Sequence, residues 1–120
     1  MNEMIDNSQL EVSEYTGEGY DKTVRFESWR VAILNYTEKF KEGNMKYLEK
    51  HCLTDEVFVL LSGSAVLVLG KEMERVPLEK NKLYNVKKDA WHNIILEPDS
   101  KILIVENDNT GPDNTEYFYF

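Results

Sequence analysis

Residues 43–63 read GNMKYLEKHCLTDEVFVLLSG and combine strand-type sequence with regularly spaced polar side chains. Glu49 and His51 are two positions apart, so a β-strand would direct both to one face. Glu56 opens the apolar run VFVLL, and His92 lies in a later strand-type segment, AWHNI. Each of these residues is expected on a face that apolar side chains continue. A polar group on an inward face costs free energy unless it is paired or binds a ligand, so the sequence predicts a polar site inside a β-barrel.

The sequence around this stretch predicts an all-β domain. About eight or nine short apolar runs alternate with turn signals at a spacing of roughly ten residues, which is typical of sandwiches and barrels. The runs VFVLL and AVLVL are apolar on both strand faces, so both faces should be covered. Turn residues at 62–64 and 98–100 predict two β-hairpins. The helical feature that we expect is a single turn at residues 37–42, with Thr37 as its N-cap.

Charge and composition exclude several classes of protein. The chain of 120 residues carries a net charge of -8, which repels nucleic acid and anionic membranes. No apolar run approaches the roughly 20 residues of a transmembrane helix, and the polar N-terminus lacks the pattern of a signal peptide. Cys52 is the single cysteine, which fits a reducing compartment. We therefore expect a cytoplasmic protein in which residues 1–9 are poorly anchored and residues 10–120 form one barrel domain.

The polar residues of the opening stretch resemble the first motif of the cupin superfamily, G-x5-H-x-H-x4-E-x6-G. Gly43, His51, Glu56 and Gly63 match this motif at its spacing. Glu49 departs from it, because the first histidine of the family usually stands at this position.

The second cupin motif, G-x5-P-x-G-x2-H-x3-N, matches only at His92. Asn81 and Asp89 stand at its glycine positions, and these residue types tolerate a left-handed backbone better than others. Lys87 and Leu96 stand at its proline and asparagine positions, with no such justification. The resemblance extends over roughly residues 43–106.

The resemblance implies a jelly-roll barrel, also called a double-stranded β-helix, with little or no helix. It also implies a divalent metal ion, such as Mn, Fe, Co, Ni or Zn, held by His51, Glu56 and His92. Glu49 is a possible fourth ligand, because a carboxylate can replace an imidazole. Without a metal, His51 would simply bond to Glu56. Proximity of Glu49 and Glu56 would then raise the pKa of one of them, which favours acid–base work or the binding of a polar ligand.

Three functions remain open at this point. The first is an enzyme acting on a small polar metabolite, metal-dependent and of the isomerase or oxygenase type, in which Glu49 or Glu56 moves a proton. The second is a non-catalytic module that binds a sugar-like or acidic metabolite without a metal. The third is a structural dimer with a vestigial site. The resemblance also implies a homodimer.

Several other side chains were assigned by residue type and strand alternation. Cys52 should face away from its neighbour His51, which argues against a nucleophilic pair of these two residues. Trp91 should likewise point away from the cavity. The aromatic segment at residues 117–120 should pair as a strand, in this barrel or against a second subunit. By residue type alone, the cavity mouth is expected to include Arg30, Tyr36 and Tyr84.

Overall fold

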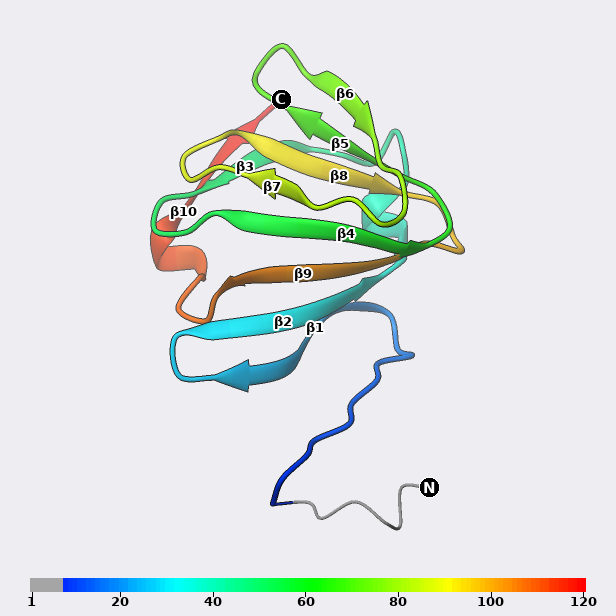
Figure 1. The fold of residues 1–120 in the computed structure, drawn as a ribbon. Coiled ribbons are helices and arrows are strands. Elements are labelled where there is room, and N and C mark those ends of the chain that lie inside the picture. Colours follow the sequence, from blue (N-terminus) through cyan, green and yellow to red (C-terminus); the bar gives the residue numbers. More distant parts are fainter. Residues whose placement is uncertain (1–7) are drawn as a thin grey trace.

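The computed structural model describes residues 8–120, which contain ten strands arranged in two facing antiparallel sheets (Figure 1). Sheet A has the strand order β1 (Gly19–Phe26), β2 (Trp29–Asn35), β9 (Lys101–Asn107), β4 (Glu56–Ser62) and β7 (Tyr84–Val86). Sheet B has the order β10 (Thr115–Tyr119), β3 (Tyr47–His51), β8 (His92–Leu96), β5 (Ala65–Leu69) and β6 (Glu74–Pro77). The two 3₁₀ helices in this part of the chain are η2 (Glu38–Phe40) and η3 (Pro112–Asn114). The predicted all-β jelly-roll barrel is therefore confirmed.

Strand alternation separates an apolar end of the barrel from a polar end. On β4 one inward face carries Glu56, Phe58 and Leu60 in succession, and all three are buried. Three other strands of the barrel repeat this order, from a polar residue to apolar ones, because alternate residues of a strand share a face. The corresponding sets are Arg30, Ala32 and Leu34 on β2, Glu106, Ile104 and Ile102 on β9, and His92, Ile94 and Leu96 on β8. One main core thus fills the apolar end and leaves the polar residues together at the other.

The prediction of two hairpins, at residues 62–64 and 98–100, is wrong. β4 pairs with β9 and β7, whereas β5 belongs to the other sheet, so residues 62–64 carry the chain from sheet A to sheet B. Residues 98–100 return it from β8 to β9 in the same way. A turn signal predicts that the chain reverses, but not which strand the reversed segment will pair with. The hairpin that does form after this turn joins β5 to β6.

The two crossing turns pack directly against each other. Gly63 adopts a left-handed backbone with φ of 76°. A Cβ atom at Gly63 would lie 2.6 Å from both the carbonyl oxygen of Asp99 and the Cα of Ser100. The position therefore needs glycine for its dihedral angle and for the close approach.

The single helical turn forms, but its predicted cap does not. η2 is shorter than expected, and the Thr37 side chain makes no capping hydrogen bond. The backbone carbonyl of Thr37 instead accepts a hydrogen bond from the Phe40 amide, at 2.9 Å. At the positions where the second cupin motif has glycine, the prediction holds: Asn81 and Asp89 have left-handed φ values of 70° and 69°.

The outer face of sheet B is covered by side chains of the sheet itself. Leu48, Val68 and Ile95 form a small cluster there, packed against Trp91 and Phe118. Trp91 thus points away from the barrel interior, as predicted. The aromatic C-terminal segment forms β10, which pairs with β3 from Thr115↔His51 to Tyr119↔Tyr47, so its predicted pairing within the barrel is confirmed.

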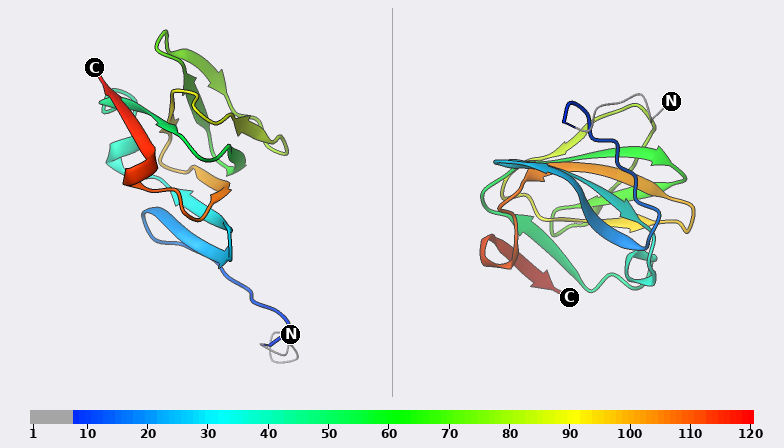
Figure 2. Two further views of the ribbon diagram at one scale, coloured as in Figure 1. Left: turned by 90° about the vertical axis from the view of Figure 1, so that its left-hand side faces the viewer. Right: turned by 90° about the horizontal axis from the view of Figure 1, so that it is seen from below.

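The chain before β1 forms no strand or helix between residues 8 and 18, and this stretch leads away from the two sheets (Figures 1 and 2). The segment predicted to be poorly anchored, residues 1–9, lies for its first seven residues outside the described part. Among residues 8–120, no helix is long and apolar enough to cross a membrane.

Candidate functional site

Strand register in sheet B brings three of the predicted site residues together. Glu49 of β3 lies directly opposite His92 of β8, and His51 lies opposite Thr115 of β10. Glu49 and His51 share the inward face of β3, as their spacing predicts, because alternate residues point the same way. The Nδ1 atom of His51 lies 3.0 Å from the Thr115 hydroxyl, which fixes the imidazole ring.

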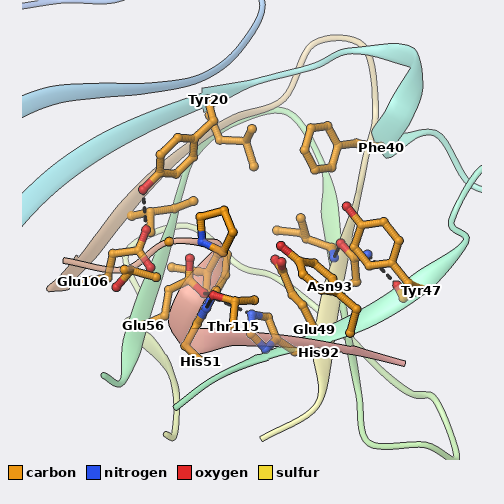
Figure 3. Close-up of a pocket in the computed structure, with 18 of the residues that line it drawn as sticks. Tyr20, Phe40, Tyr47, Glu49, His51, Glu56, His92, Asn93, Glu106 and Thr115 are labelled. Atoms are coloured by element: carbon orange, nitrogen blue, oxygen red, sulfur yellow. Dashed lines mark hydrogen bonds and ion pairs between the residues drawn. The ribbon is translucent and has the colours of Figure 1, made fainter. Parts of the chain in front are cut away.

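The fourth predicted residue, Glu56, reaches the histidines from the opposite sheet. Its Oε1 atom lies 3.0 Å from Nε2 of His51 and 3.0 Å from Nε2 of His92. All three side chains are buried. Figure 3 shows the two rings and the carboxyl group gathered at one end of the cavity, with Glu49 beside them. The structure thus brings all four predicted residues into one site, while the roles assigned to them stay predictions.

The hydrogen bonds of His92 restrict where its proton can be. Nδ1 of His92 lies 3.0 Å from the backbone carbonyl of Ala90, so this nitrogen must carry a hydrogen. A neutral ring then presents a lone pair at Nε2, which cannot donate to the Glu56 carboxylate. The 3.0 Å contact with Glu56 therefore requires one additional proton, held either by His92 or by Glu56.

The charges of these groups shift their pKa values in opposite directions. Burial alone would raise the pKa of Glu56, but hydrogen bonds from His51 and His92, together with their charges, lower it well below its usual range. Burial would lower the pKa of each histidine, but the hydrogen bond to Glu56 and the charge of Glu56 raise both pKa values instead. Both shifts favour the additional proton on the imidazoles and an ionised Glu56.

Glu49 differs from Glu56 because its carboxyl group has no hydrogen bond to any residue between 8 and 120. Burial raises the pKa of Glu49, and the neighbouring histidines only partly oppose this effect. The carboxyl group is half-buried and lines the cavity, so it is accessible to a ligand. A carboxyl group with a raised pKa keeps its proton to higher pH than an ordinary carboxyl group, which suits it to give as well as to take a proton.

The cavity between the sheets has a volume of about 230 Å³. Its wall is apolar on the side of the core, where Phe58, Ile94 and Ile104 lie, and polar around the histidines. Tyr47, Asn93 and Phe40 border the side near Glu49, and Tyr20 and Glu106 border the opposite side (Figure 3). Of the three residues expected at the mouth, Arg30 lines this cavity, whereas Tyr36 and Tyr84 do not.

Comparison with solved structures finds this arrangement of strands in proteins of low sequence identity. A cupin-2 domain protein of Shewanella frigidimarina is 16% identical, with a TM-score of 0.60 over 78% of this chain and 84% of its own. A variant of Streptomyces Pac13 solved with uridine is 17% identical, with a TM-score of 0.65 over 90% of this chain and 85% of its own. The chain has the cupin fold. The resemblance drawn from the first motif is thereby confirmed at the level of the fold.

Other cupin structures with this fold include enzymes. Pac13 is a nucleoside dehydratase. A 3,4-ketoisomerase of Helicobacter canadensis is 15% identical, with a TM-score of 0.58 over 72% of this chain and 66% of its own. No protein-family model matches the sequence, and a search of curated proteins finds no match. At these identities the comparisons establish the fold, and the chemistry has to be argued from the site.

The side chains of this cupin barrel fit a divalent cation. Among residues 8–120, two sets of donors have atoms within 4.8 Å of one another, namely Glu49, His51 and His92, and His51, Glu56 and Glu106. The hydrogen bonds at Nδ1 of both histidines leave Nε2 directed into the cavity, which is how a second shell orients metal-binding imidazoles. Nitrogen and carboxylate donors together suit the borderline ions predicted from the sequence.

The sequence interpretation missed Glu106 and Tyr20, and it named Arg30 only by residue type. Arg30 and Glu106 face each other across the β2·β9 pair, and the Tyr20 hydroxyl donates a hydrogen bond to Glu106 Oε2. Strand alternation could have placed Arg30 and Glu106 on inward faces, because Arg30 shares a face with Ala32 and Glu106 shares one with Ile104. Cys52, in contrast, behaves as predicted, since its Sγ atom points to Glu116 rather than to the cavity.

Proposed function

We propose that the chain is an enzyme that binds a small polar metabolite in the cupin barrel and transfers a proton to or from it. The observation that supports this proposal best is the position of Glu49. Its carboxyl group lines the cavity without a hydrogen-bonding partner among residues 8–120, next to the array of His51, Glu56 and His92. A free carboxyl group beside protonated, buried imidazoles suits an isomerase-type reaction, in which a proton leaves one atom of the ligand and returns to another.

The residues of the site would divide this task. Glu49 would take or give the proton at the ligand, because its raised pKa suits both directions. The ion pairs of Glu56 with His51 and His92 would hold the imidazoles in place and keep positive charge near a developing oxyanion. This assignment keeps Glu49 as the predicted catalytic carboxylate and gives Glu56 a positioning role.

A divalent cation, if bound, would be held by His51 and Glu56 together with a third donor, which is either His92, as the sequence predicted, or Glu106. Such an ion supplies Lewis-acid polarisation of a carbonyl or hydroxyl oxygen. The proposed proton transfer by Glu49 does not depend on which group polarises that oxygen, because protonated imidazoles and a cation both place positive charge there.

The ligand class follows from the wall of the cavity. Three carboxyl groups, Glu49, Glu56 and Glu106, line it together with cationic groups that include Arg30 and Lys39, so charges of both signs face the cavity and a neutral ligand suits it. Hydrogen-bonding side chains such as Asn93 and Tyr47 border it together with apolar ones. We therefore favour an uncharged hydroxylated molecule, of sugar or nucleoside size, and the binding of uridine by Pac13 supports this class.

The experiment uses the two histidines of the chain as reporters of binding. Because both lie in the site, ¹⁵N NMR of their imidazoles detects a ligand in the cavity without background from other histidines. Uridine and a set of neutral aldoses and ketoses are added in turn, and those that shift the imidazole signals are incubated with the protein in D₂O. We expect solvent deuterium to replace one carbon-bound hydrogen of a bound ligand, and we expect Glu49→Gln to retain binding but lose the exchange.

Binding without exchange by the wild-type protein would contradict the enzyme and support the non-catalytic binding module. Equal exchange in Glu49→Gln would contradict the role of this carboxyl group. A matched control is Glu116→Gln, which removes an exposed carboxylate outside the cavity.

We also propose that the chain forms a homodimer. The edge strand β10 leaves Tyr117 and Tyr119 exposed, and Phe120 follows it with 60% of its surface accessible. Edge strands with exposed aromatic residues are normally covered by a partner, because they offer both unpaired backbone groups and apolar surface.

A further inference from the structure

Glu106 is a buried carboxyl group that the proposed proton transfer does not use. It ends the inward face of β9 after Ile102 and Ile104, and only 6% of its surface is exposed. Its Oε2 atom accepts hydrogen bonds from the Tyr20 hydroxyl and from Arg30 Nη2, the latter at 3.3 Å. Two donors from two different strands therefore fix the orientation of this carboxyl group.

The other oxygen of Glu106 has no partner. Oε1 is buried and makes no hydrogen bond to any residue in the described part of the chain. A buried acceptor without a partner is unfavourable, so such an atom indicates a missing interaction. Figure 3 shows the Glu106 carboxyl group beside that of Glu56, and the two carboxylates form a group with His51 in which the donor atoms lie within 4.8 Å. The ligands of a single ion at about 2.1 Å are separated by roughly 3–4 Å, so this group can close on one cation with small side-chain movements.

Electrostatics supports a cation at this position. Glu56 and Glu106 place two carboxylates at the inner end of the cavity. The one buried guanidinium there, Arg30, is shared with Asp108, whose Oδ1 atom lies 3.8 Å from Nη1. Arg30 therefore cannot neutralise both carboxylates. Protons on the histidines compensate the remaining negative charge in the absence of a cation, and a bound cation would replace them in this role.

Glu49 is less suited to bind the ion. Its carboxyl group is half-buried, and no side chain in residues 8–120 orients it by a hydrogen bond. Glu106 is deeper, and it has the oriented geometry typical of metal-binding carboxylates, with one oxygen held by outer groups and the other free. Both belong to candidate donor groups that share His51, but the Nε2 atom of His51 can bind only one ion at a time.

We propose that a divalent cation in this barrel is bound by His51, Glu56 and Glu106, and that Glu49 stays free of it. Tyr20 and Arg30 then act as positioning residues, because their hydrogen bonds to Oε2 fix the orientation of the Glu106 carboxyl group. This assignment deepens the proposed function and rests on it in one respect only, because it leaves Glu49 available for proton transfer. The cavity would in that case have a cation end and an acid–base end, with the ligand between them.

The test compares two matched carboxylate variants, Glu106→Gln and Glu49→Gln, by calorimetric titration with Zn²⁺ and by the visible spectrum of bound Co²⁺. We expect Glu106→Gln to weaken cation binding at least tenfold, since even the loss of an outer group costs about 10–100-fold in affinity. We expect Glu49→Gln to change the affinity less than threefold. His51→Gln should abolish binding, which places the measured ion in the barrel.

The opposite ranking of the two carboxylate variants would overturn the proposal, because it would place the ion on Glu49. Retention of binding in His51→Gln, or no binding by the wild-type protein at millimolar Zn²⁺, would overturn it as well. Glu106→Gln leaves Arg30 without its closest carboxylate, so its folding is checked by thermal denaturation. Tyr20→Phe provides a second, milder variant, because it removes one hydrogen-bond donor to Glu106 without changing any charge. We expect it to weaken cation binding by a smaller factor than Glu106→Gln does. Unchanged affinity would contradict the positioning role of Tyr20.

Failure of this proposal is distinguishable from failure of the proposed function. Deuterium exchange is measured in parallel with EDTA present and with Zn²⁺ present. Exchange in either condition supports proton transfer by Glu49 even if the cation proves to bind elsewhere, and cation binding through Glu106 can be measured even if no exchange occurs.

Discussion

Replacing Glu56 by glutamine tests the physical basis of the whole site. The change keeps the volume of the side chain and removes only its charge. In the wild-type protein Oε1 of Glu56 lies 3.0 Å from Nε2 of His51 and of His92, and the Glu56 side chain is 7% exposed. The variant therefore removes the carboxylate closest to two buried imidazoles and leaves only the more distant Glu49 and Glu106 near their positive charge.

The size of the effect depends on pH, and the sign follows from the pKa shifts. The pKa of each histidine is raised in the folded protein, so the stability that they contribute is fully present below the unfolded pKa of about 6.5 and is lost as pH rises through the raised value. The pKa of Glu56 is lowered, so its contribution is present above the unfolded pKa of about 4.3 and is lost as pH falls through the lowered value. The ion pairs thus stabilise the fold most at about pH 5–6.5.

We expect Glu56→Gln to lower the free energy of unfolding by about 3–5 kcal/mol at pH 6, because breaking a buried ion pair leaves a charge uncompensated. The imidazoles lose their charge as pH rises through their raised pKa values, so at pH 9 the loss should shrink toward about 1–3 kcal/mol, the cost of imperfect hydrogen bonds. Urea denaturation at both pH values, in the presence of EDTA, measures the difference. Glu116→Gln, on the exposed surface, should change neither value by more than about 0.5 kcal/mol.

Histidine NMR gives an independent reading of the same change. With Glu56 neutralised, burial becomes the dominant influence, so the pKa of His51 and of His92 should fall below the ordinary value of about 6.5. An equal loss of stability at pH 6 and pH 9 would refute this account. So would histidine pKa values that stay raised in the variant, because another group would then have to hold the protons.

Two further predictions concern the fold and the assembly. Gly63→Ala should lower the free energy of unfolding by about 2–4 kcal/mol, and Gly70→Ala by only about 1–2 kcal/mol. Both glycines have left-handed backbones, but only Gly63 lies against other backbone atoms. Equal shifts in the melting temperature of the two variants would contradict the packing of the crossing turns. Sedimentation equilibrium should give twice the monomer mass of 14.1 kDa, and Tyr119→Lys should shift the protein to the monomer; a monomeric wild-type protein at high concentration would dismiss the proposed dimer.

The inward faces of the strands could be predicted from the sequence because they depend only on alternation. The faces of Tyr47, Glu49 and His51, and of Glu56 with Phe58, follow from a period of two, and the structure has them as expected. The left-handed turns at Asn81 and Asp89 were predictable because these residues stand at the glycine positions of the second cupin motif and are of types that accept a positive φ.

Pairing between distant strands could not be predicted in this way. The opposition of Arg30 and Glu106 depends on the register of β2 against β9, and no local pattern specifies which strands become neighbours. The same limit explains the wrong hairpins, because the apolar faces of β4 and β5 suit a partner in either sheet. Strand alternation alone could have placed Glu106 on the inward face with Ile102 and Ile104. Only the register shows that Arg30 and Tyr20 hold it there.

The arrangement of charges also determines how a ligand must enter the site. Any ligand atom or cation that binds at Nε2 of His51 or His92 has to displace the Glu56 contact or share it, and it has to displace the additional proton. Metal binding to imidazole requires the neutral ring, so cation affinity must rise with pH until the raised histidine pKa values are passed. A hydroxyl group that binds at Glu49 meets no such competition, because no residue in the described part of the chain occupies its carboxyl group. A neutral ligand at Glu49 should therefore lack the pH dependence that a cation bound at His51 shows, and this difference separates the two ends of the cavity by their chemistry.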